Sequence, residues 1–215
     1  KIFKEAKKNN KIIPFRGPIN SLTVPCAEDL QYKLIKNDKY GFKNNNIIYE
    51  KKIKNFLLGD SYAEGLCENN ENDIAGHLNE KKNYTINFGV TGTGPLISLA
   101  ILREFGNYFK PKNVIYLYFE GNDLDELNYE KEDSTLTKYL NDDFNQDYFN
   151  KYDEIKSFLI KAEQETEKII YSKSKNTFQP NKKNKLDILK AHLKDILEIN
   201  NLRNIFKYKI LKKQE

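Results

Sequence analysis

Methionine and tryptophan are missing from this 215-residue sequence, and cysteine and histidine occur only twice each. Neither cysteine lies in a Cys-x-x-Cys motif, and only His77 and His192 could join them, so the sequence predicts no zinc site. No segment approaches the roughly 20 consecutive apolar residues that a membrane-spanning helix needs. Since methionine is absent even at position 1, we expect the chain to be a piece of a longer product, with any targeting segment upstream.

Arginine is also scarce, at 3 of the 36 basic residues, and the net charge of +5 is unevenly distributed. The charge is +8 over residues 1–54, −7 over residues 55–130 and +4 over residues 131–215. The acidic middle block carries the motifs described below, and negative charge there opposes binding to phosphates. We therefore expect no nucleic-acid partner and a solvated lysine-rich surface.

Hydrophobic patterning divides the chain into three parts. Pro14, Pro18 and Pro25 break any helix in residues 1–52, which we expect to be an irregular arm laid over a domain rather than a core. Residues 53–130 alternate short apolar runs with helical patterns, as parallel α/β folds do. The expected elements are strands at 53–59, 84–88 and 113–119, with helices at 72–82 and 95–109.

The run at residues 113–119 is almost continuously apolar and aromatic, which is typical of a strand buried on both faces. After residue 130 the pattern changes to amphipathic helices, expected at 133–172 and 185–207 and separated by a polar linker. We read residues 131–215 as a helical insertion. A plain solvated insertion, a lid over a site and a partner-binding surface all fit this pattern.

Small or reactive residues follow each of the three expected strands. The first strand leads into Gly59-Asp60-Ser61, the second into the glycine-rich run at 89–95, and the third into Glu120-Gly121-Asn122-Asp123. Because ligands bind at the carboxyl ends of parallel strands, these segments are expected to meet at one edge of the sheet.

This combination suits acyl transfer. A serine on a tight turn can present its hydroxyl as a nucleophile. The backbone N–H groups of Ser61 and Gly92 and the side-chain amide of Asn122 would supply three donors to an oxyanion. Asp60 is expected to shape the turn rather than to serve as a triad acid.

The three motifs, LLGDSYAEG, NFGVTGTGP and FEGNDLDEL, resemble the first three blocks of the SGNH (GDSL-type) hydrolases. The resemblance covers about residues 38–130 and implies a three-layer, flavodoxin-like parallel sheet. It implies Ser61 as nucleophile, with Gly92 and Asn122 as oxyanion donors and no cofactor. The substrate class that the resemblance implies is a carbohydrate or lipid-type ester. Residues 40–123 look like bacterial members tied to envelope or polysaccharide metabolism, which favours a periplasmic or envelope location, with any membrane anchor outside this chain.

One departure from the family pattern is decisive for activity. The family's base is a histidine in a late Asp-x-x-His block, and no such block occurs in this sequence. We expect His77 and His192 to be surface or helix-packing residues. Without a base, Ser61 is a poor nucleophile, so we expect little activity from residues 1–215 alone, with the base following Glu215. The alternative is a non-catalytic glycan- or acyl-binding module on the same fold.

Three further patterns carry weaker alternatives. The glycine run lacks the Lys-Ser/Thr of a phosphate loop. Asp123, Asp125 and Glu126 are more typical of partners for a helix dipole than of a cation site. Spacing alone does not decide whether Cys26 and Cys67 form a disulfide or remain two buried thiols. The resemblance to envelope proteins favours the disulfide. The precise substrate, hydrolysis versus transfer, and the oligomeric state stay open.

Overall fold

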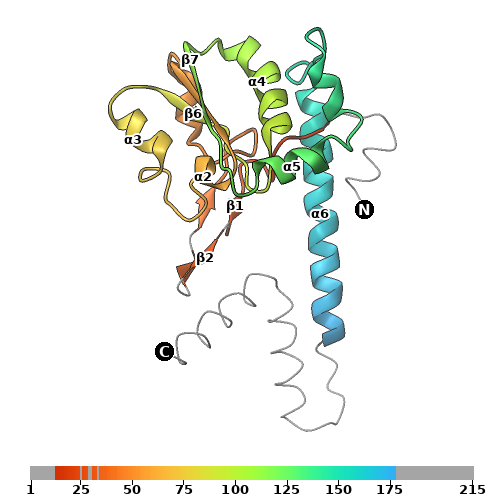
Figure 1. The fold of residues 1–215 in the computed structure, drawn as a ribbon. Coiled ribbons are helices and arrows are strands. Elements are labelled where there is room, and N and C mark those ends of the chain that lie inside the picture. The colour runs from red at the N-terminus through yellow and green to blue at the C-terminus, as the bar shows by residue number, and fades with distance from the viewer. Residues whose placement is uncertain (1–12, 25, 29–30, 33, 178–215) are drawn as a thin grey trace, which may run out of the picture. The chain divides into compact units, whose positions relative to one another are not determined.

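The protein is described by a computed structural model that covers residues 13–24, 26–28, 31–32 and 34–177. Short elements precede the sheet: β1 (Leu22–Thr23), β2 (Ala27–Glu28), β3 (Gln31–Tyr32), β4 (Ile35–Lys36) and the 3-10 helix η1 (Asn46–Glu50). The α/β part follows, with β5 (Asn55–Gly59), α2 (Ser61–Glu64), α3 (Ile74–Glu80), β6 (Thr85–Asn87), α4 (Pro95–Phe109), β7 (Asn113–Leu117) and α5 (Asp123–Glu130). The last elements are the 3-10 helix η2 (Leu136–Leu140) and α6 (Tyr152–Thr177) (Figure 1).

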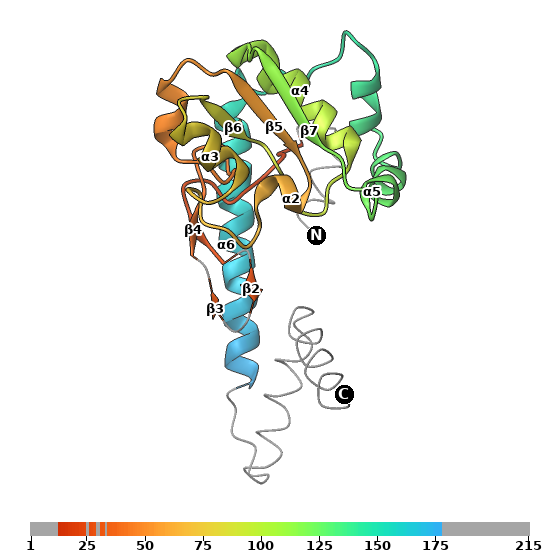
Figure 2. The ribbon, with the colours of Figure 1, turned by 60° about the vertical axis from the view of Figure 1, so that its left-hand side comes forward.

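The central feature is a parallel sheet of three strands in the order β6-β5-β7 (Figure 2). The first connection steps from β5 to β6, and the second steps back across β5 to β7. Right-handed crossovers that step in opposite directions place their helices on opposite faces of a sheet.

The three strands and the helices α3 and α4 that the sequence predicts are confirmed, as is the parallel α/β class.

Side chains of β5 show the two covered faces directly. Phe56 and Leu58 belong to the main core cluster together with residues of α4, including Phe105. Leu57, between them, packs in a second cluster with Ala63 of α2 and Ala75 near the start of α3. Because neighbouring residues of a strand point to opposite faces, the all-apolar centre of β5 is the sequence signature of a strand covered by helices on both sides.

The position of β7 differs from the prediction. This strand pairs only with β5 and is an edge strand of the described sheet, with Val114 and Tyr116 exposed. All residues of β5 and of β6 are buried, although β6, like β7, pairs only with β5. The prediction of burial on both faces of residues 113–119 was therefore wrong, because burial depends on what covers the strand and the apolar composition of the run does not report it.

In the described N-terminal residues, regular structure is limited to the two-residue strands β1–β4 and to η1, and the segment belongs to the core rather than lying over it. Phe15, Ile19, Phe42 and Ile48 are buried in the main cluster with residues of α4. Aromatic contacts join the N-terminal segment to α4: Phe42 lies edge-on to Phe105, with their ring centroids 5.6 Å apart.

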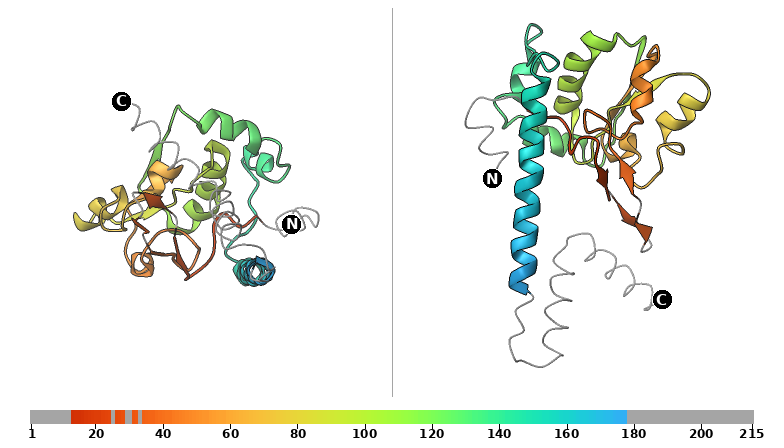
Figure 3. Two further views of the ribbon diagram at one scale, coloured as in Figure 1. Left: turned by 90° about the horizontal axis from the view of Figure 1, so that it is seen from below. Right: turned by 180° about the vertical axis from the view of Figure 1, so that it is seen from behind.

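The region after residue 130 also departs from the prediction. Residues 133–151 contain η2 and turns instead of a continuous helix, and α6 starts only at Tyr152. Its first turns lie beside the N-terminal segment (Figure 3). There the centroid of the Tyr152 ring lies 5.3 Å from that of Tyr40. Ile155 and Leu159 are buried in the main cluster, as the predicted apolar stripe requires.

By compactness the chain divides into two units, Lys1–Glu165 and Thr166–Glu215. The expected helix at 185–207 and His192 lie outside the described residues. Within the described part, no helix combines the length and the apolar character needed to cross a membrane.

Candidate active site at the carboxyl edge of the sheet

The segments that follow β5, β6 and β7 leave the sheet at the same edge (Figure 2). Gly59 is in register with Leu117 of β7, and the Val90 N–H, beyond β6, donates to the Gly59 carbonyl at 3.0 Å. The direction of the crossovers reverses between β5 and β7, and such a switch point is where open α/β sheets hold their ligands. The structure therefore brings the segments of Ser61, Gly92 and Asn122 to one edge.

Ser61 opens the short helix α2 directly after β5. Asp60, which is buried, caps this helix, with its carboxylate accepting from the Tyr62 N–H at 2.9 Å. The Ser61 hydroxyl lies 3.5 Å from the second Asp60 oxygen, which is a long contact for an O–H donor. Asp60 thus shapes the strand-to-helix turn, and the half-buried Ser61 stands at its apex.

The glycine-rich loop after β6 is held from two sides by buried glutamates. Glu64 of α2 accepts from the Thr91 N–H at 2.7 Å and from the Thr91 hydroxyl, and its other oxygen pairs with Arg16. Glu130 of α5 accepts from the Gly94 N–H at 2.6 Å and from the Leu96 N–H at 2.9 Å. These acceptors hold residues 91–96 between α2 and α5.

Glu130 also serves as the cap of another helix. Helix α4 has no side-chain cap of its own, and the carboxylate of Glu130 meets its first N–H groups. A negative charge at a helix N-terminus is favourable. Burial nevertheless raises the pKa of Glu130, and the backbone donors from Gly94, Leu96 and Ile97 oppose that rise.

Gly92 lies in the middle of this loop with φ of +71°, a conformation that favours glycine. No atom lies within 4 Å of the place where a Cβ would stand, so the residue is exposed with open space around it. A bare backbone at this point leaves room for a ligand to approach its N–H.

Asn122 occupies the N-cap of α5, but its side chain caps no backbone N–H of that helix. Asparagine at this position ordinarily does so. Among the described residues, its buried Oδ1 has no hydrogen-bond partner. The neighbouring Asp123 instead fixes the turn, with Oδ2 accepting from the Phe119 N–H and the Tyr116 hydroxyl, both at 3.0 Å.

A buried ion pair lies at the C-terminal end of α2. The Lys43 ammonium lies 3.0 Å from Asp73 Oδ2 and donates to the carbonyls of Gly65 at 2.7 Å and Glu64 at 3.2 Å. The Asn87 amide reaches the same Asp73 oxygen at 3.4 Å. These bonds hold the end of α2 against β6. Sequence reasoning missed Lys43, Glu64 and Glu130, because their partners are remote in the chain and no local spacing marks them.

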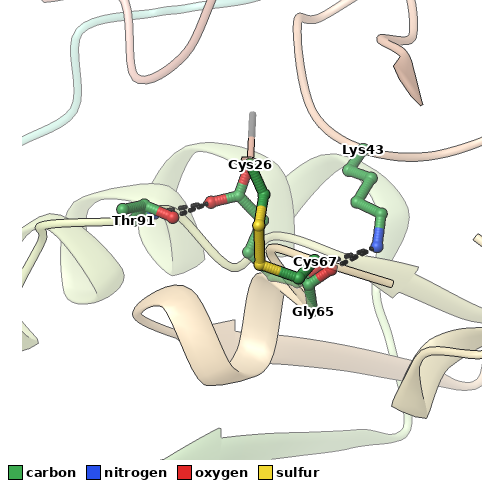
Figure 4. The surroundings of a disulfide bond; sticks show 6 residues. Cys26, Lys43, Gly65, Cys67 and Thr91 are labelled. Carbon is green, nitrogen blue, oxygen red and sulfur yellow. Dashed lines mark hydrogen bonds between the residues drawn. A yellow bond between two sulfur atoms is a disulfide. The ribbon is translucent and has the colours of Figure 1, made fainter. Parts of the chain in front are cut away.

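The two cysteines form a disulfide, Cys26–Cys67, with a Cα–Cα distance of 5.3 Å (Figure 4). The bond joins the N-terminal segment to the turn that follows α2, close in sequence to Gly65 and its contact with Lys43. The pairing favoured by the family resemblance is therefore the one observed.

His77, the one histidine among the described residues, is a surface residue of α3, as expected. Its side chain is 64% exposed, and its Nδ1 lies 3.9 Å from Glu80. It lines a cavity of about 700 Å³ between η1 and α3, away from the three strand ends. Within the described part of the chain, no group of three or more potential ligands is placed to hold a metal ion.

Comparisons with protein families, with curated proteins and with solved structures found no match to this chain.

Proposed function

We propose that the chain carries the acyl-binding site of an SGNH-type serine ester hydrolase or acyltransferase acting on carbohydrate or lipid-type esters. The supporting observation is that the three motif segments leave one parallel sheet at the same edge, with Ser61 at the apex of one turn and the Asn122 amide unused as a cap. The strand order β6-β5-β7 corresponds to the first three strands of the flavodoxin-like order 2-1-3-4-5, which supports that layout.

In the proposed mechanism the Ser61 hydroxyl attacks the acyl carbon of the ester. The negative charge that develops on the carbonyl oxygen is held by the N–H groups of Ser61 and Gly92 and by the Asn122 amide. Asp60 keeps the turn in shape through its cap bond to Tyr62. The sugar or alcohol then leaves, and water or a second alcohol takes the acyl group from Ser61.

A proton acceptor for Ser61 is required, and the described residues supply no histidine near it, since His77 contacts Glu80 on α3. This observation favours a second candidate, a non-catalytic module that uses the same edge to bind a glycan or acyl group. The disulfide supports an oxidising compartment for either candidate, such as the bacterial periplasm or envelope.

A fluorophosphonate probe separates the two candidates. An esterase is expected to become covalently labelled at Ser61, and mass spectrometry of the Ser61 peptide would locate the adduct. The matched control is Ser61→Ala, which should abolish the adduct without unfolding the protein. The probe is applied to the product that includes any sequence following Glu215, where the base is expected. If that folded wild-type product stays unlabelled, the hydrolase is eliminated and the binding module is left.

A further inference from the structure

Two exposed aromatic rings lie together beside Ser61. Tyr62 of α2 is 62% exposed and Phe119, just after β7, is 39% exposed. Their ring centroids are 4.7 Å apart and their planes are inclined by 44°. Resting on the proposed function, we propose that Tyr62 and Phe119 form a platform on which a sugar ring of a neutral carbohydrate ester packs.

The platform is held in place by its surroundings. The backbone of Phe119 is fixed by the buried Asp123, which accepts from the Phe119 N–H at 3.0 Å. A Cβ on Gly121 would lie 2.5 Å from Cε1 of the Phe119 ring, so the ring rests directly on that glycine. The backbone of Tyr62 is held by its N–H, which donates to the Asp60 carboxylate at 2.9 Å, and its ring packs on that of Phe119. Rings that are already ordered lose little conformational freedom when a ligand binds.

The position of the rings matches the proposed chemistry. Tyr62 directly follows Ser61, and the parallel register of Gly59 with Leu117 brings Phe119 to the same end of the sheet. A sugar ring lying on the platform would hold its ester within reach of the Ser61 hydroxyl. The platform would therefore position the substrate rather than take part in bond making.

The chemistry of the surface selects the occupant. The apolar C–H face of a pyranose packs on an open aromatic face, while its hydroxyl groups stay in water. An acyl chain would instead need an enclosed apolar groove to leave water. Residues 55–130 carry a net charge of −7, with Glu120, Asp125 and Glu126 near the same edge, so an acidic sugar would be repelled.

Isothermal titration of the full chain with partly acetylated xylo-oligosaccharides, which are neutral, tests the proposal. We expect wild-type binding and at least about fivefold weaker binding in Tyr62→Ala and in Phe119→Ala, in line with the loss of one aromatic contact. Tyr62→Phe keeps the ring and should bind like wild type. The matched control is Tyr129→Ala on α5, which removes a 70%-exposed tyrosine outside the platform. Near-ultraviolet circular dichroism checks that every variant is folded.

Three results would overturn the platform: no binding by the wild type, unchanged binding in both folded alanine variants, or tighter binding of acidic oligogalacturonates than of the neutral sugars. The fluorophosphonate result is independent of these. Ring-dependent sugar binding without labelling would refute the hydrolase and retain the platform. Labelling at Ser61 together with sugar binding that does not depend on the two rings would retain the hydrolase and refute the platform.

Discussion

Glu64 offers the sharpest test of how the glycine loop is held. Its side chain is 3% exposed, and its two oxygens accept from Arg16 and from both donors of Thr91. In Glu64→Ala, the half-buried Arg16 and the exposed Thr91 lose their buried acceptor. Because both donors can turn to water, the expected loss of unfolding free energy is about 1–3 kcal/mol, below that for breaking a fully buried charge pair.

The assay is urea unfolding monitored by circular dichroism. Unfolding free energies are compared between proteins whose free energy falls with urea concentration at the same slope. Glu80→Ala is the matched control, because it is the same substitution at a helical glutamate whose side chain is 79% exposed. Its effect should stay within about 0.5 kcal/mol. If Glu64→Ala lost no more stability than Glu80→Ala, the clamp of α2 on the loop would be refuted.

Two further predictions concern the N-terminal segment. Replacing both Cys26 and Cys67 with serine should lower the unfolding free energy by about 3–4 kcal/mol, because the disulfide closes a loop of 41 residues in the unfolded chain. In urea unfolding, the reduced wild type should be as stable as this variant. Equal stability of the oxidised and the reduced protein would count against the pairing. Burial raises the pKa of Asp38 above its ordinary value of 3.8, against opposing hydrogen bonds from Tyr49 and others. The folded state thus favours the protonated acid, so the stability of wild type relative to Asp38→Asn should be greatest below about pH 3.8 and fall as the pH rises through the folded pKa. Urea titrations from pH 4 to 7 would contradict this if the difference stayed constant or grew.

The parts of the fold that could be predicted from sequence are those with a continuous or a periodic run of apolar residues. The apolar run of β5 and the proline-started pattern of α4 each carry their own signal. The edge position of β7 could not be read in this way, since its apolar and aromatic residues would suit a central strand equally well. Burial of Phe15 and Phe42 was missed for a related reason: single aromatic residues in an irregular segment have no period.

The candidate site also has residues that the sequence predicts and residues that it does not. Ser61, Gly92 and Asn122 stand at strand ends, where the rule for parallel sheets applies to sequence directly. The side chains that hold the site together, such as Lys43 and Glu64, act through partners many residues away. The proposed relation to the SGNH hydrolases rests on three short motifs, and the histidine of that family has no counterpart near Ser61 among the described residues.

The central claim is that the Ser61 N–H, the Gly92 N–H and the Asn122 side-chain amide converge on one point. A crystal structure of the chain, soaked with a small phosphonate, measures this most directly. The account predicts one oxygen position about 3 Å from all three donors. Donors that point to separate positions, or an Asn122 amide turned away from Ser61, would contradict it.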